Sequence, residues 1–197
     1  MDLVTSDRVA HAWHDPSVLD GMRVGELAAH LARSVLQVEW YLDGPIAPDA
    51  DLVDAPGYYA DLSGTTDPTS TLNTGVRARS TETSAQGADA LTAQVKAARE
   101  RLRARIPQEP ADRRMTVRHQ GRTLLLDEYL RTRCVGLAVH TEDLALSLDS
   151  DVRAPAATLA VAVDVLLAAA RRRHGDVAVM HALARRERDD VDALRVL

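Results

Sequence analysis

The chain has 197 residues, of which 46% are hydrophobic and 27% charged, and its net charge is −5. This composition is typical of a globular protein with one domain. Basic residues are spread along the chain and aromatic residues make up 3% of it, which argues against a nucleic-acid surface, since such a surface needs a basic patch or stacking rings. No apolar run approaches the roughly 20 residues that span a bilayer, so no membrane partner is expected.

The N-terminal stretch MDLVTSDRVAHAW has no basic segment followed by an apolar core, so we do not expect a secretory signal. Cys134 is the single cysteine, which excludes a disulfide within the chain and predicts a cytoplasmic location. Because Cys134 falls on an apolar stripe, we interpret it as a buried small hydrophobic residue.

The first predicted helix covers residues 6–14, with Ser6 as its N-cap. A second helix is predicted from Val24 to Leu42 and ends at Gly44 and Pro45. Its apolar stripe consists of Val24, Leu27, Ala28, Leu31, Val35, Val38 and Leu42. His30 lies on the flank of this stripe, where it is either a ligand or a partly exposed histidine at the edge of a bundle.

The segment Asp43–Leu72 is rich in proline, glycine and small polar residues, which predicts a long irregular connection. Tyr58 and Tyr59 mark one short turn of helix in it. Such a connection is either a cover over a pocket or a mobile linker. Helix is predicted again from Asn73 to Ile106, interrupted at Gly87.

Residues 115–118 and 122–125 flank the dipeptide Gln120-Gly121, which predicts a short β-hairpin that must lie against helices. Asp127 is then predicted to cap the central helix.

The central helix is predicted from Leu130 to Leu148. One face carries Leu130, Cys134, Leu137, Thr141, Leu144 and Leu148. The opposite side carries Val135, Val139 and Leu146, so burial on more than one face is expected. His140 lies beside the stripe, and Gly136 precedes it by one turn. A glycine inside a helix costs roughly 1 kcal/mol relative to alanine, so Gly136 needs a structural or functional reason.

Two further helices follow, the first opened by Pro155 and the second by Asp176. The sequence therefore predicts an all-α fold: a helical bundle over residues 1–150, with a small hairpin, and a C-terminal helical extension over residues 151–197 packed on it within the same domain. His30 and His140 flank the stripes of two different helices on the same rotational side, which predicts that they converge.

Two stretches, MRVGELAAHLARSVLQVEWYLD and LLLDEYLRTRCVGLAVHTEDLALSL, resemble the DinB-like superfamily. More closely, the chain is similar to the mycothiol-dependent maleylpyruvate isomerase N-terminal domain family, over roughly residues 5–150. The resemblance implies a DinB-like four-helix bundle with a zinc-like divalent metal near one end. It also implies metal ligands at His30, at position 136 and at His140. The family has a glutamate at position 136, where this chain has Gly136.

Three carboxylates stand near enough in sequence to be considered as substitutes: Glu26, Glu142 and Asp143. Asp143 has the best direction, and we expect it to orient His140 rather than to touch the metal. The alternative is that all three are helix caps and surface charges.

The activity that the resemblance implies is that of a metal- and mycothiol-dependent transferase or isomerase, with a small-molecule thiol and an electrophile as partners. The metal lowers the pKa of the mycothiol sulfur, and the thiolate adds to an electrophilic carbon. Arg131 and Arg133 either hold carboxylates of substrate or cofactor, or form ordinary surface ion pairs. Two alternatives stay open: a relative that binds a small ligand or partner without metal chemistry, and a helical scaffold that forms a homodimer.

Overall fold

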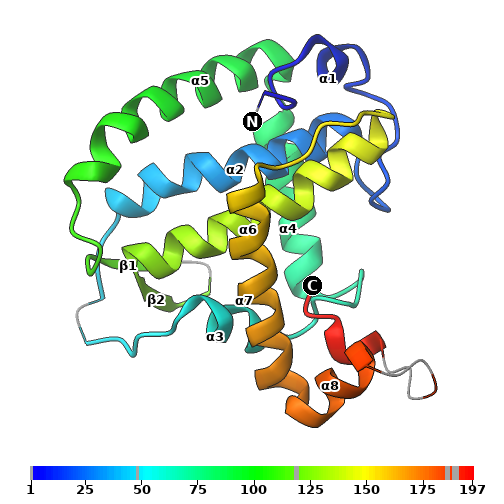
Figure 1. Ribbon diagram of the computed structural model, residues 1–197. Coiled ribbons are helices and arrows are strands. Elements are labelled where there is room, and N and C mark those ends of the chain that lie inside the picture. Colours follow the sequence, from blue (N-terminus) through cyan, green and yellow to red (C-terminus); the bar gives the residue numbers. More distant parts are fainter. Residues whose placement is uncertain (1, 48, 118–119, 185–186, 188–190) are drawn as a thin grey trace.

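The computed structural model describes every residue except 1, 48, 118–119, 185–186 and 188–190, and Figure 1 shows its arrangement of helices. The described chain is mostly helical, with one antiparallel sheet of two strands. The predicted fold class, an all-α bundle with a small hairpin, is confirmed. No helix in the described part of the chain is both long and apolar enough to cross a membrane.

The N-terminal part contains α1 (Asp7–His11) and the long helix α2 (Val24–Leu42). The Ser6 hydroxyl caps α1 by accepting a hydrogen bond from the Val9 amide, as expected. Helix α1 is shorter than the predicted range 6–14. The bounds of α2 match the prediction, and Glu26 fixes its start by accepting a hydrogen bond from the Arg23 amide at 2.8 Å.

The irregular connection holds one short helix, α3 (Ala55–Ala60), which contains both predicted tyrosines and is capped by Asp54. Beyond it, the predicted helix 73–106 is two helices, α4 (Thr71–Ser84) and α5 (Gly87–Arg105). Gly87 has φ +85°, a left-handed conformation that breaks the helix rather than bending it. The break lets α4 and α5 each pack on α2.

A short 3-10 turn, η1 (Ile106–Gln108), leads into the hairpin of β1 (Arg114–Val117) and β2 (Arg122–Leu125). Arg114 pairs with Leu125 and Val117 with Arg122, in the register that the predicted turn implies. The predicted end of the first strand, residue 118, lies outside the described residues. The hairpin packs on α2 and, through its second strand, leads directly into the next helix.

That helix, α6 (Leu126–Ser147), begins four residues before the predicted start. Leu125 is therefore its N-cap, and Asp127 lies inside the first turn, where its carboxylate accepts a hydrogen bond from the Glu128 amide at 2.7 Å. The prediction that Asp127 caps the helix was wrong, because no loop separates the strand from the helix. The expected burial on more than one face is confirmed by Val135 and Leu144, which are fully buried, although Leu146 is 65% exposed. The expectation that Cys134 is buried was wrong, because it is only partly buried.

The C-terminal part comprises α7 (Ala156–His174), α8 (Asp176–Ala184) and η3 (Val191–Leu194). Helix α7 packs against α6 and α3, and α8 and η3 pack on α7 (Figure 1). The Arg173 guanidinium donates hydrogen bonds to the carbonyls of Tyr59 (2.6 Å), Leu62 (2.8 Å) and Val196 (2.9 Å). Arg173 of α7 thus links the connection that contains α3 to the C-terminal segment.

Candidate functional site

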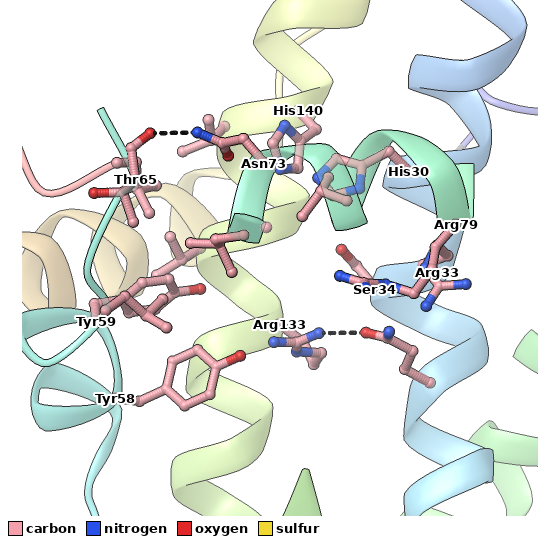
Figure 2. Close-up of a pocket in the computed structure, with 18 of the residues that line it drawn as sticks. His30, Arg33, Ser34, Tyr58, Tyr59, Thr65, Asn73, Arg79, Arg133 and His140 are labelled. Carbon is pink, nitrogen blue, oxygen red and sulfur yellow. Dashed lines mark hydrogen bonds between the residues drawn. The ribbon is translucent and has the colours of Figure 1, made fainter. Parts of the chain in front are cut away.

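A cavity of about 430 Å³ lies between α2, α4 and α6, and the connection that contains α3 closes one side of it. Figure 2 shows its lining, to which His30 contributes from α2, Arg79 from α4 and His140 from α6. Tyr58 and Tyr59 also line it, so the long connection does form a wall of the cavity.

The two histidines that the sequence predicted to converge are in contact. The ring centroids of His30 and His140 are 4.3 Å apart and the rings are inclined at 65°, an edge-to-face arrangement. The Nδ1 atom of His30 is buried and has no hydrogen-bond partner among the described residues. Burial, followed by the charges of His140, Arg33, Arg133 and Arg79, lowers the pKa of His30 well below its usual value of 6.5. His30 is therefore a neutral imidazole at neutral pH.

His140 is held by a carboxylate from its own helix. Its Nδ1 atom lies 3.0 Å from Oδ2 of Asp143, and both side chains are 21% exposed. The other two candidate carboxylates are engaged elsewhere: Glu26 at the start of α2 and with the Thr81 hydroxyl, and Glu142 with Arg153 at 3.2 Å. Asp143 is thus the one candidate carboxylate that lines this cavity.

Gly136 marks a close approach of α6 to α2. A Cβ atom on residue 136 would lie 2.7 Å from the Oγ atom of Ser34, well inside van der Waals contact. The glycine therefore has a packing reason. A side chain at position 136 would require the hydroxyl of Ser34, which is 6% exposed, to move aside.

The cavity also gathers three arginines from three helices, Arg33 of α2, Arg79 of α4 and Arg133 of α6. Of the two arginines that the sequence singled out, Arg133 lines the cavity. Arg131 points elsewhere and forms an ion pair with Glu128 at 2.9 Å. Sequence reasoning missed Arg33 and Arg79. Arg33 lies three residues after His30, a spacing that places it on the same helical face.

The one cysteine of the chain, Cys134, lies on α6 but apart from the cavity. Cys134 does not belong to its lining. Burial raises the pKa of the Cys134 thiol, so it stays protonated at neutral pH.

The family model described as Mycothiol maleylpyruvate isomerase N-terminal domain matches residues 2–145 of the chain. The chain belongs to this family. The match ends inside α6, so that α7, α8 and η3 lie beyond it. No curated protein and no solved structure shows significant similarity to the chain.

The residues present do not fit the three-ligand metal centre that membership of the mycothiol maleylpyruvate isomerase N-terminal domain family implies. Among the described residues, no group of three or more His, Cys, Asp and Glu side chains is arranged to hold a metal ion. The ring centroids of His30 and His140 are 4.3 Å apart, so the two imidazoles are in direct contact.

Proposed function

We propose that this protein binds a small molecule in the cavity between α2, α4 and α6, without the metal chemistry of its family. The observation that carries the proposal is the packing of Gly136 on Ser34. Gly136 supplies no ligand at the position where the family resemblance implies the third ligand of a zinc site, and a side chain there would have to displace the Ser34 hydroxyl. The cavity itself is kept, at a volume within the range of small-molecule sites.

A metal- and mycothiol-dependent transferase or isomerase is the second candidate, and the meeting of His30 and His140 favours it. A zinc-like ion bound there would supply thiolate at neutral pH for addition to an electrophile. Asp143 would then orient His140 through Nδ1, leaving Nε2 as the ligand atom.

The metal content of protein purified without an affinity tag separates the two candidates. We expect the natural chain to contain far less than one zinc per molecule and to bind added zinc weakly. Stoichiometric zinc that is lost on His30→Ala would instead support the metal-dependent enzyme and overturn the proposal.

A restored ligand provides the positive control. Gly136→Glu alone would clash with the Ser34 hydroxyl, so the variant to build is Ser34→Ala/Gly136→Glu, which removes that atom. We expect this variant to bind one zinc per chain, measured by calorimetry, and to lose it when His140→Ala is added. Ser34→Ala/Gly136→Gln is the matched control, because it has the same bulk without the carboxylate.

A further inference from the structure

Among the described residues, most arginines outside the cavity are ion-paired with a carboxylate, whereas the three that line it are not. Ten arginines outside the cavity form an ion pair with a carboxylate, counted over the described residues. Among the same described residues, none of Arg33, Arg79 and Arg133 forms such an ion pair. The protein carries more acidic than basic residues, yet Asp143 is the only acidic side chain among the described residues that line the cavity.

Arg133 is surrounded by neutral groups. It donates hydrogen bonds to the side chains of Gln37 at 2.9 Å and Thr132 at 3.1 Å, and its guanidinium carbon lies 4.7 Å from the ring centroid of Tyr129. Tyr58 also lines the cavity. A guanidinium has five N–H donors, so these partners leave donors free, and none of them neutralises the charge.

Arg33 and Arg79 add to the positive charge from the α2 and α4 sides. Arg33 donates a hydrogen bond to the Thr83 hydroxyl at 3.2 Å and lies 5.3 Å from the ring centroid of Trp40, so its partners are neutral as well. No hydrogen bond or ion pair of the Arg79 guanidinium occurs with another described residue. The one acidic side chain among the described lining residues, Asp143, is engaged with His140.

A charged group in a confined, partly desolvated position is costly unless an opposite charge accompanies it. Planar guanidinium groups bind carboxylates and phosphates through paired hydrogen bonds, more strongly than they bind neutral acceptors. The occupant that would stabilise this arrangement is therefore an anion with two or more oxygen acceptors.

We infer that the cavity binds its small molecule through an oxyanion group, a carboxylate or a phosphate, which acts as the counter-ion of Arg133, with Arg33 and Arg79 adding attraction. This inference rests on the proposed function and names the class of ligand. The apolar part of the lining, which includes Leu62, Val76 and Val139, accommodates a short hydrocarbon body attached to the anionic group.

Calorimetric titration with matched probes tests the inference. The probes are succinate, its neutral diamide succinamide, and inorganic phosphate, each added at low ionic strength to the natural protein. We expect saturable binding of succinate, of phosphate or of both, and none of succinamide. The comparison of succinate with phosphate separates a carboxylate site from a phosphate site.

Variants then locate the site. Arg133→Met should weaken binding of the anion at least tenfold, and Arg79→Met several-fold. Arg131→Met is the control, because Arg131 lies on the same helix but outside the cavity and is paired with Glu128. Circular dichroism checks the fold of each variant. If Arg133→Met does not fold, Arg79→Met still tests the inference, because the Arg79 guanidinium has no hydrogen bond or ion pair with another described residue that the substitution would remove.

Three results would overturn the inference: no anion binds, succinamide binds as tightly as succinate, or Arg131→Met weakens binding as much as the cavity variants do. Tight binding of succinamide would leave the proposed function standing, because the cavity would still take a small molecule. Stoichiometric zinc in the natural protein would defeat the proposed function whatever the anion titrations give.

Discussion

The imidazoles of His30 and His140 touch edge to face, yet their Nδ1 atoms differ in surroundings. His140 Nδ1 has the Asp143 carboxylate at 3.0 Å, whereas His30 Nδ1 is buried without a partner among the described residues. A buried polar atom that lacks a hydrogen bond destabilises a fold by about 1–3 kcal/mol, so the two rings should contribute to stability with opposite sign.

We therefore predict that His30→Leu raises the free energy of unfolding by about 1 kcal/mol, because it removes the unpartnered nitrogen from the core. His140→Leu is the matched control. It should lower that free energy by about 1 kcal/mol, because it leaves the Asp143 carboxylate without its partner. Urea unfolding followed by circular dichroism measures both. Equal losses of stability in the two variants would contradict the prediction.

We predict that the titration of His30 makes the free energy of unfolding depend on pH. Burial, followed by neighbouring positive charges, lowers the pKa of His30 in the folded protein well below 6.5, whereas in the unfolded chain it has its usual value. Between the two values the unfolded chain binds a proton that the folded protein does not. Stability therefore falls as the pH is lowered below 6.5, by at most about 1.4 kcal/mol per pH unit from this group, and is unaffected above it.

The difference between the natural protein and His30→Leu isolates that contribution. Urea unfolding from pH 7.5 to pH 5 should show a steeper loss of stability in the natural protein. Parallel curves would mean that His30 titrates near its usual pKa, and the description of a neutral, enclosed imidazole would then be wrong.

The sequence predicted that the two histidines meet because helical spacing places both on the same rotational side of their helices. His30 and His140 each flank an apolar stripe, and the stripes must face each other in a bundle. The same spacing flagged Gly136 as anomalous without explaining it. The explanation is the contact with Ser34, which lies on another helix and depends on how closely α2 and α6 cross. No pattern within one helix contains that distance.

The sequence did not predict Arg33 and Arg79 as residues of the cavity, for a similar reason. An arginine on a helix flank is usually solvated or ion-paired, as Arg131 is. What distinguishes Arg33 and Arg79 is that they line the cavity without a carboxylate partner among the described residues, and that depends on how α2, α4 and α6 assemble. The start of α6 was misplaced because strand β2 runs into the helix without the loop that the predicted cap at Asp127 would require.

Because Gly25 lies close to the Trp13 indole, we predict that a side chain at position 25, near the start of α2, destabilises the fold. A Cβ atom on residue 25 would lie 2.5 Å from Cε2 of the Trp13 indole, a rigid group. We expect Gly25→Ala to lower the free energy of unfolding by about 1–3 kcal/mol, although alanine favours helix, because the indole would have to leave its place.

Gly75 in α4 provides the matched control for Gly25. A Cβ atom there would approach only the guanidinium end of Arg79, at 3.0 Å, and that flexible side chain can move. Gly75→Ala should therefore raise the free energy of unfolding by up to about 1 kcal/mol through helix propensity. Thermal unfolding compares the two variants. A destabilisation of similar size in both would show that the Trp13 contact is not the cause.

The hydrogen bonds of Arg173 predict that the C-terminal segment stabilises the wall of the cavity. Its guanidinium donates hydrogen bonds to the carbonyls of Tyr59, Leu62 and Val196, and Tyr59 and Leu62 line the cavity. Arg173→Met keeps the apolar stem but leaves these carbonyls without their donor. We expect it to lower the free energy of unfolding by about 2 kcal/mol and to increase amide hydrogen exchange over residues 59–62 and 194–197.

Arg171→Met is the control on the same helix. Arg171 is an exposed residue whose ion pair with Asp176, at 2.7 Å, lies in solvent, so its loss should leave both stability and exchange nearly unchanged. If the two variants behave alike, Arg173 does not link the segments. If Arg173→Met increases exchange in both segments together, the C-terminal segment stabilises the wall of the cavity through this one side chain, and ligand affinity should fall in the same variant.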